Sequence, residues 1–210
     1  TLTVESDWSS ASYYFSLAAI SDVGTEITLS SYKKNSLQGD SDLANIYRHF
    51  GVASIFKENS VTLKKESKAL ANFEYNLVNA PDIAQTIAVS CFALGIACDL
   101  TGLHTLKIKE TDRLVALKTE IEKLGGHVEI TDTSLHLQSN TLFNLNSELS
   151  SPLSDGAVEA IATYNDHRMA MAFAPLALKT PIVIEDAEVV SKSYPTFWDD
   201  LESIGFQITK

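Results

Sequence analysis

The sequence predicts an α/β fold built from three related units, each with the element order β-α-β-α-β-β and the third one incomplete. The first observation is a repeated segment in which an apolar residue and a glycine lead into a strand pattern: "HFGVASIF", "KLGGHVEI" and "SIGFQIT". The glycines, Gly51, Gly125 and Gly205, are typical of left-handed helix C-caps. The second observation is that the same order of helix and strand signals precedes each glycine. We therefore expect each glycine to end the second helix of a supersecondary unit.

In the first unit, an apolar helix is expected to begin near Ser9, and the β-branched strand "TEITLSS" follows it. A second helix is expected to begin near Asp40. The hairpin "VASIFKENSVTLKK", with its turn near Glu58 and Asn59, completes the unit, which spans about residues 1–66.

The second unit opens with the strand "LANFEYNLVN" and spans about residues 67–140. Its first helix is expected near Asp82, its next strand is "IACDLTGL", and its second helix is expected near Asp112. It ends with the hairpin "HVEITDTSLHLQS", whose turn is expected near Asp132 and Thr133.

The third unit, about residues 155–210, has the strand "AVEAIAT", a helix from near Asp166, the strand "TPIVIEDA" and a helix from near Pro195. Only "FQITK" follows, so about one strand is missing, and we expect a segment N-terminal to this chain to supply it. Residues 137–156 are expected to form an irregular linker. The three units together predict one domain over residues 1–210.

Composition and charge exclude several function classes. Hydrophobic residues make up 45% of the chain and charged residues 20%, which is typical of a folded globular protein. The net charge of −11 argues against nucleic acid or an anionic membrane as the main partner. The apolar run "IAVSCFALGIAC" is too short to span a bilayer, and its cysteines, Cys91 and Cys98, are interpreted as small buried residues. The start "TLTVESD" has no Met and no basic and apolar leader, so we expect the chain to be cut from a longer protein.

Ionisable side chains cluster where several of the predicted helices begin. The clusters lie in "KIKETDRL", "YNDHR" and "VVSKSYPTFW", and they contain Lys107, Lys109, Glu110, Arg113, His167, Arg168 and Lys192. Taken one at a time, the cations are explained as solvated surface charges and His167 as a structural hydrogen-bonding residue. Asp82 is explained in the same way as a helix N-cap.

The joint pattern favours an anion site. Two of the chain's three arginines, Arg113 and Arg168 but not Arg48, stand at helix starts in related positions. A helix dipole disfavours a cation there by roughly 0.3–1 kcal/mol, so the repeated placement suggests that an anion offsets this cost. Arginine suits a phosphate or carboxylate that accepts from two N–H groups. The residues alone thus predict that the chain binds a small phosphorylated or carboxylated ligand.

The motifs "IKETDRL" and "YNDHRMAMAF", together with "SDWSSASYYF", "NSLQGD" and "PDIAQTIA", resemble the C-terminal half of the 5-enolpyruvylshikimate 3-phosphate synthases (3-phosphoshikimate 1-carboxyvinyltransferases). The matching segments reach from Val4 to about Phe197. The resemblance implies an inside-out α/β prism, in which two domains each carry three β-α-β-α-β-β units. It also implies that the extreme N-terminus of the full chain crosses over to complete this domain.

The same resemblance implies a reaction that needs no metal and no organic cofactor. The enolpyruvyl group of phosphoenolpyruvate would move to the 5-hydroxyl of shikimate 3-phosphate, and phosphate would be released. Such a transfer needs an acid for the methylene carbon and a base for the hydroxyl. The implied roles are catalysis by Asp82 (base), Glu110 and Lys192 (proton transfer); phosphoenolpyruvate binding by Arg113, Arg168, Lys192 and His167; and shikimate 3-phosphate binding by Asp82, Lys109 and Thr105.

Two departures from the family pattern affect the expected activity. Thr105 stands where the family commonly has asparagine, so that contact is either lost or relayed by water. The Lys-Ser pair, the arginines and the Ser-Ser-Gln cluster of the family's N-terminal domain are absent from this sequence. We therefore expect the chain to carry about half of an active site and to be nearly inactive alone.

Two other readings stay open: a ligand-binding or regulatory module, and one subunit of a split enzyme. The resemblance also implies a full-length monomer in the cytoplasm, with a plastid location after removal of a transit peptide as the alternative.

Overall fold

The computed structural model of the chain describes residues 4–143 and 158–209. Its helices are α1 (Trp8–Ile20), α2 (Leu43–Ile46), α3 (Ala84–Leu94), α4 (Arg113–Lys123), α5 (His167–Phe173) and α6 (Phe197–Ser203). Its strands are β1 (Glu26–Ser30), β2 (Val52–Lys57), β3 (Ser60–Lys65), β4 (Asn72–Asn76), β5 (Ala97–Thr101), β6 (Val128–Ile130), β7 (Leu135–Leu137), β8 (Ala160–Ile161) and β9 (Val183–Ile184). Short 3₁₀ segments cover Gly39–Asp42, Pro81–Ile83, His104–Ile108, Ala174–Leu178 and Ala187–Lys192. The predicted mixture of helices and strands is confirmed.

The strands of the described residues form three sheets that follow one another along the chain. The first has the order β1-β3-β2 and is antiparallel. The second has the order β4-β5-β7-β6, and β4 and β5 are parallel. The third consists of β8 and β9, which are also parallel. Because parallel neighbours need a crossover connection, α3 joins β4 to β5 and α5 lies between β8 and β9.

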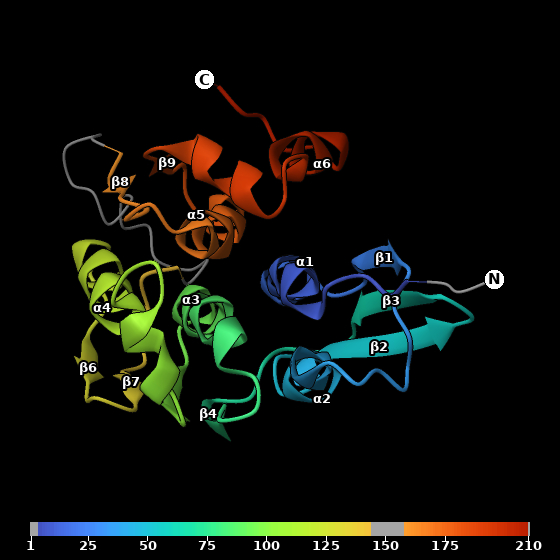
Figure 1. The fold of residues 1–210 in the computed structure, drawn as a ribbon, viewed down its shortest axis with the longest axis horizontal. Coiled ribbons are helices and arrows are strands. Elements are labelled where there is room, and N and C mark those ends of the chain that lie inside the picture. Colours follow the sequence, from blue (N-terminus) through green and yellow to red (C-terminus); the bar gives the residue numbers. More distant parts are fainter. Residues whose placement is uncertain (1–3, 144–157, 210) are drawn as a thin grey trace.

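Helices α1, α3 and α5 lie side by side in the middle of the molecule, and the sheets lie around them (Figure 1). In α1 only Ser10 is not buried, and α3 is buried over almost its whole length. Helices that are apolar on all sides are stable only inside a core. Their buried hydroxyls bond to one another, with 2.9 Å between Ser12 and Thr86 and 2.8 Å between Ser90 and Ser16. The two helices can therefore pack together without leaving these groups unsatisfied.

Three helices begin after an aspartate: Asp112 and Asp166 lie where the sequence predicts helix starts, and Asp7 lies two residues before the predicted start near Ser9. Each carboxylate accepts from a backbone N–H of the first turn: Asp7 from Ser9, Asp112 from Val115, and Asp166 from Arg168. This is the ordinary N-cap arrangement, which satisfies a donor that has no partner inside the helix. The predicted starts of α1, α4 and α5 are therefore confirmed to within two residues.

The three repeated glycines end helical turns as predicted. Gly51, Gly125 and Gly205 have φ values of 78°, 86° and 107°. After each glycine, the next backbone N–H donates to a carbonyl five residues earlier: Val52 to Tyr47 (3.0 Å), Gly126 to Ile121 (3.0 Å) and Phe206 to Leu201 (3.1 Å). These bonds define a Schellman motif, which needs a residue with positive φ.

The prediction of a strand at "FQITK" is wrong for the described residues 206–209, which form no strand. An open groove of about 780 Å³ lies beside this segment, and Val183, Ile184, Phe206 and Ile208 are among its lining residues. A strand pattern cannot form a ladder without a neighbouring strand, and β9 is not paired with this segment. The predicted linker begins at the last residue of β7; residues 138–143 contain no helix or strand, and its remaining residues, 144–156, lie outside the described residues.

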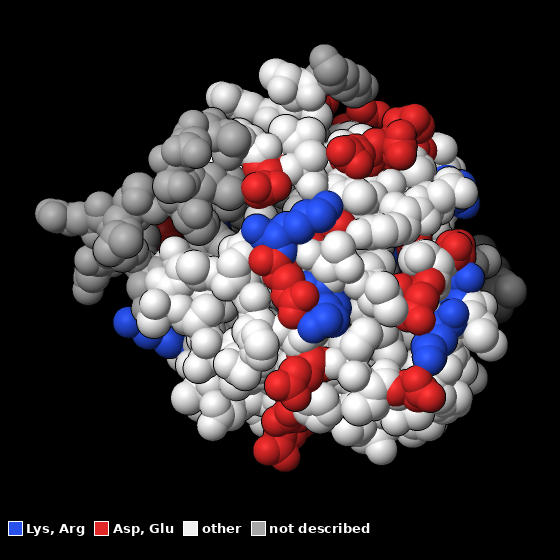
Figure 2. All heavy atoms as spheres, turned by 90° about the vertical axis from the view of Figure 1, so that its left-hand side faces the viewer, with Lys and Arg blue, Asp and Glu red and all other residues white. Residues whose placement is uncertain are grey.

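Charged side chains of both signs mix on the face that carries α4. Figure 2 shows Lys and Arg atoms next to Asp and Glu atoms on the described part of this face. Helix α4 contributes the ion pairs Lys118–Glu122 (2.7 Å) and Lys123–Glu120 (2.8 Å). None of the helices in residues 4–143 and 158–209 is both long enough and apolar enough to cross a bilayer.

Candidate active site

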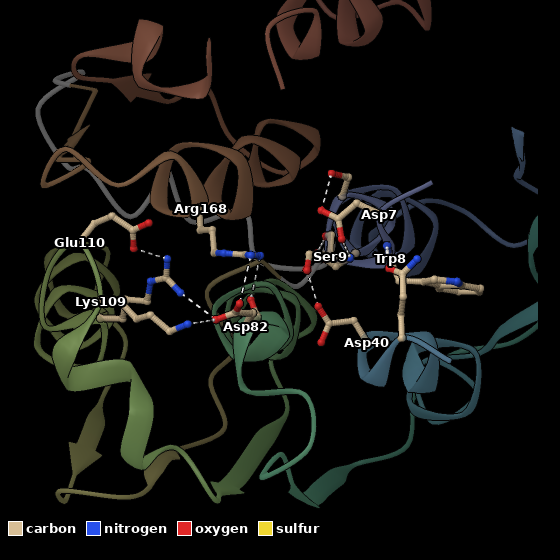
Figure 3. Close-up of polar contacts among 12 residues, drawn as sticks. Asp7, Trp8, Ser9, Asp40, Asp82, Lys109, Glu110 and Arg168 are labelled. Atoms are coloured by element: carbon tan, nitrogen blue, oxygen red, sulfur yellow. Dashed lines mark hydrogen bonds and ion pairs between the residues drawn. The ribbon is translucent and has the colours of Figure 1, made fainter. Parts of the chain in front are cut away.

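The starts of three buried helices point toward one region. Figure 3 shows Asp7 at the start of α1, Asp82 at the 3₁₀ turn before α3, and Arg168 in the first turn of α5. Lys109 and Glu110 reach the same region from the loop before α4 (Figure 3). Six ionisable residues there are joined by ion pairs, and we call them the Asp82 network: Asp82, Lys109, Glu110, Arg113, Asp166 and Arg168.

Arg113 is the buried centre of the Asp82 network, with only 1% of its side chain exposed. Its Nε donates to Asp166 (2.7 Å), its Nη1 to Asp82 (3.0 Å) and its Nη2 to Glu110 (2.6 Å). All three nitrogens therefore face carboxylates, and the Asp166 side chain is itself fully buried. From the sequence we expect a bound anion to offset the dipole cost of a cation at this helix start. In the structure the chain's own carboxylates offset it.

Asp82 is the point where three cations meet. Its Oδ2 lies 3.2 Å from Nη2 of Arg168, and its Oδ1 lies 3.1 Å from Nζ of Lys109, in addition to the contact with Arg113. Burial raises the pKa of Asp82, but the charges of Arg168, Lys109 and Arg113 outweigh burial and leave this pKa below its ordinary value. The Asp82 side chain is 28% exposed, so a small ligand can reach it.

Glu110 and His167 occupy the same edge of the network. Burial raises the pKa of Glu110, yet its own backbone N–H and the charge of Arg113 lower this pKa more, so the carboxyl is ionised at neutral pH. Burial, followed by the charge of Arg168, lowers the pKa of His167. Its Nδ1 is buried and has no hydrogen-bond partner among the described residues. The imidazole is therefore neutral at neutral pH, and one of its ring nitrogens is not committed to a protein partner.

Lys192, Thr105 and His167 are the three predicted site residues that have no ion pair or hydrogen bond to the Asp82 network in the described structure. Nζ of Lys192 donates to the backbone carbonyl (2.9 Å) and the side-chain oxygen (2.7 Å) of Asn165. Because Asn165 precedes Asp166, Lys192 is held next to the network through this neighbour. The hydroxyl of Thr105 is buried and has no hydrogen-bond partner among the described residues.

Sequence reasoning missed two carboxylates of this region as site residues. Asp166 was predicted only as a helix start, because its ion pair is with Arg113, 53 residues earlier, and no local pattern shows it. Asp40 accepts from the Ser9 hydroxyl, and burial raises its pKa even though Ser9 and Arg168 act to lower it. Asp40 follows the "NSLQG" segment, but no charged neighbour in the sequence marks its contact with α1.

Known proteins are similar to this chain over nearly its whole length. The family model described as EPSP synthase (3-phosphoshikimate 1-carboxyvinyltransferase) matches residues 1–201. The 3-phosphoshikimate 1-carboxyvinyltransferase of Bacteroides fragilis is 43% identical over 207 residues, which cover 98% of this chain and 48% of that protein. The enzyme of the same name from Methanospirillum hungatei is 34% identical over 206 residues, which cover 97% of this chain and 44% of that protein.

Solved structures share the fold. EPSP synthase from Acinetobacter baumannii superposes with a TM-score of 0.76 at 22% identity, over 98% of this chain and 47% of that one. The enolpyruvyl transferase NikO from Streptomyces tendae gives a TM-score of 0.64 at 15% identity, over 99% of this chain and 45% of that one. The chain spans about half the length of the curated relatives it matches. With a family match over almost its whole length, the chain belongs to the EPSP synthase family.

Proposed function

We propose that this chain is the C-terminal domain of an EPSP synthase and carries about half of its active site. The observation that carries the proposal is the Asp82 carboxylate, partly exposed and surrounded by Lys109, Arg113 and Arg168 near the starts of α4 and α5. Such a cluster suits a ligand with several negative groups, because each ligand oxygen can replace a carboxylate oxygen of the chain. The family's two substrates, phosphoenolpyruvate and shikimate 3-phosphate, are ligands of this kind.

The domain is proposed to be an inside-out prism of three units, about residues 1–66, 67–140 and 155–210, that form one domain over residues 1–210. The second unit supports this proposal because β7 lies between β5 and β6 in its sheet. In the third unit a groove occupies the corresponding place between β9 and residues 206–209. A strand from the remainder of the full-length protein is proposed to fill the groove.

The proposed reaction joins the 5-hydroxyl oxygen of shikimate 3-phosphate to C2 of phosphoenolpyruvate. Asp82 takes the hydroxyl proton, while Glu110 and Lys192 deliver a proton to the methylene carbon. The new C–O bond gives a tetrahedral adduct. Loss of the proton from the new methyl group and of phosphate from C2 then restores the double bond. The lowered pKa of Asp82 keeps this carboxylate ionised, as a base must be before it accepts a proton.

The proposed binding roles divide the cations between the substrates. Phosphoenolpyruvate is bound by Arg113, Arg168, Lys192 and His167, and shikimate 3-phosphate is bound by Asp82, Lys109 and Thr105. Because Nη2 of Arg113 donates to Glu110 in this structure, the substrate carboxylate is proposed to take the place of Glu110. That exchange removes a neighbouring cation from Glu110, which raises its pKa and suits it to proton transfer.

The remaining proposals concern the surroundings of the enzyme. The full-length protein is proposed to act as a cytoplasmic monomer that needs no metal or organic cofactor. Its ligands are small molecules, with no nucleic acid and no membrane involved.

Phosphate release from phosphoenolpyruvate and shikimate 3-phosphate tests the proposal. The full-length protein is expected to be active, this chain alone inactive, and a mixture with the separately made other half active. Robust turnover by the chain alone would contradict the half-site. Binding of shikimate 3-phosphate by an inactive full-length protein would instead support a binding module.

A matched pair of lysine variants tests the assigned cluster. Lys109 contacts Asp82, whereas Lys107 pairs with the exposed Asp132 at 2.6 Å. In the full-length protein, Lys109→Ala is expected to lower kcat/KM for shikimate 3-phosphate by about 10- to 100-fold, because one charged contact is lost. Lys107→Ala is expected to change it less than about twofold. Equal effects of the two substitutions would contradict the assignment.

A further inference from the structure

Residues 163–166 form a tight turn with an unusual backbone. The N–H of Asp166 donates to the carbonyl of Thr163 at 2.9 Å, and both central residues have positive φ, 54° for Tyr164 and 59° for Asn165. Turns of this shape are normally built with glycine or asparagine, and a tyrosine in the left-handed region is rare. Two adjacent non-glycine residues in this region persist only if the surroundings fix them.

The first of these surroundings is Glu120 on α4, a residue with no solvent exposure. Its Oε1 accepts from the Tyr164 hydroxyl at 2.6 Å, and its Oε2 accepts from the N–H of Ala162 at 3.2 Å. Lys123 supplies a counter-charge at 2.8 Å. A single buried carboxylate thus binds the chain just before the turn and the first central residue of the turn. Charge-assisted bonds to a buried acceptor are strong and directional.

The turn at residues 163–166 holds two groups of the site. Asn165 supplies both oxygens that accept from Lys192, and Asp166 supplies the carboxylate that bonds Nε of Arg113. Helix α4 therefore contacts this segment at two places, through Arg113 at its first residue and through Glu120 two turns later. Lys192 therefore bonds to the same turn that Glu120 contacts through Tyr164 and Ala162.

We propose that Glu120 and Tyr164 are positioning residues, which hold the turn at 163–166 so that Asn165 presents Lys192 to the site. The proposal rests on the proposed function for the role of Lys192, but not for the geometry of the turn. Neither residue touches the reacting groups. Their effect is expected on the orientation of Lys192 and hence on turnover, with substrate binding by Lys109 and Asp82 retained.

The kinetic test uses the full-length protein with Tyr164→Phe. This substitution removes one hydroxyl and leaves the ring, and we expect kcat to fall by about tenfold or more while KM for shikimate 3-phosphate changes less than about threefold. Tyr75→Phe is the matched control, because the Tyr75 hydroxyl donates to the carboxylate of Asp42, outside the Asp82 network. A kcat of Tyr164→Phe equal to that of the wild type and the control would overturn the proposal.

A second measurement does not depend on enzyme activity. In a ¹⁵N-edited NMR spectrum of this chain, the Lys192 ammonium, assigned by its disappearance in Lys192→Arg, is expected to give a resolved signal because two oxygens accept from it. Tyr164→Phe is expected to broaden or shift this signal, and Tyr75→Phe is expected to leave it unchanged. An unchanged Lys192 signal in Tyr164→Phe would overturn the proposal even if the full-length protein were active.

Glu120→Gln keeps the test decisive if Tyr164→Phe reduces folding. The glutamine retains one carbonyl oxygen for the Tyr164 hydroxyl but loses the charge. The kcat of Glu120→Gln and the chemical shift of its Lys192 ammonium signal are therefore both expected to lie between the wild-type values and those of Glu120→Ala. A purely structural role predicts loss of thermal stability without this ordered series, and that result would contradict the proposal. If the wild-type full-length protein makes no product, the proposed function fails while the NMR series still decides the role of the turn.

Discussion

At the scale of single residues, the Asp82 network is held together by mutual neutralisation. Three cations and three carboxylates alternate through it: Lys109, Arg113, Arg168, Asp82, Glu110 and Asp166. Burying any one of these charges alone would be costly, and the attraction between partners offsets that cost only while all are present. Asp82 contacts all three cations, so the network is expected to be most sensitive to its removal.

Asp82→Asn is expected to reduce the free energy of unfolding by about 2 kcal/mol at pH 7, because three cations lose a shared counter-charge. The pKa of Asp82 is lower in the folded chain than its ordinary value of 3.8. The ionised carboxylate therefore stabilises the fold above pH 3.8, and this contribution is lost as the pH falls through the lowered pKa. Urea unfolding from pH 3 to pH 7 is expected to show the wild type and Asp82→Asn converging toward acid. A constant difference across this range would show that the carboxylate charge is not responsible.

Which site residues could be predicted depends on whether their signal is local. Arg113 and Arg168 stand out in the sequence because cations are unfavourable at helix starts. Glu120 looks like a surface residue paired with Lys123, three positions along the helix. Its burial follows the spacing of Arg113, Leu117 and Ile121 on one side of α4, and a glutamate on that side is the signal that was available. Its bond to Tyr164 joins segments 44 residues apart, and no local pattern contains it.

At the scale of elements, two helix ends need a glycine for different reasons: a left-handed backbone alone, or a left-handed backbone together with the absence of a side chain. Gly51 and Gly205 both have positive φ and both close a Schellman motif. A Cβ on Gly51 would lie 2.0 Å from the carbonyl oxygen of Ser67, whereas a Cβ on Gly205 would have no atom within 4 Å. Gly205 therefore needs only the left-handed conformation, and Gly51 also needs the absence of a side chain.

Substitution by alanine is expected to lower the free energy of unfolding by different amounts at Gly51 and Gly205. Gly205→Ala is expected to cost about 1 kcal/mol for the left-handed backbone. Gly51→Ala is expected to cost about 3 kcal/mol or more, because the backbone carbonyl of Ser67 has to move as well. Chemical denaturation of the two variants measures the difference directly. Similar losses in both would mean that the segment around Ser67 shifts at little cost.

Local signals explain why most elements could be predicted and one could not. The helix starts at Asp112 and Asp166, the turns closed by glycines and the hairpin 52–65 each depend on neighbouring residues, and all are present. Near Asp40 and Asp82 the chain instead forms 3₁₀ segments, and α2 ends at Ile46, before Gly51. The segment 206–209 has an alternating pattern but forms no strand, because strand formation depends on a partner rather than on local sequence. The same reason limits β8 and β9 to two residues each.

At the scale of the whole molecule, the three sheets differ in completeness around a common core of helices. The second sheet has four paired strands, and β5 is covered on both edges by β4 and β7. Among the described residues the third has only β8 and β9, and one side of β9 faces the groove next to residues 206–209. Exposed edges and groove-lining apolar residues such as Trp198 and Ile182 make this the part of the described structure that a neighbouring strand would change most.

Hydrogen exchange measures that change. In this chain alone, the amides of residues 182–184 and 206–209 are expected to exchange quickly, because few of them have a strand partner. In the full-length protein, a strand in the groove would satisfy them and slow their exchange by about 100-fold or more. The amides of β5 and β7 serve as the internal control, since their ladder is complete and should exchange alike in both proteins. Equal rates for residues 182–184 in the two proteins would mean that the groove takes no strand, and the third unit would then have to be stable with its edge open.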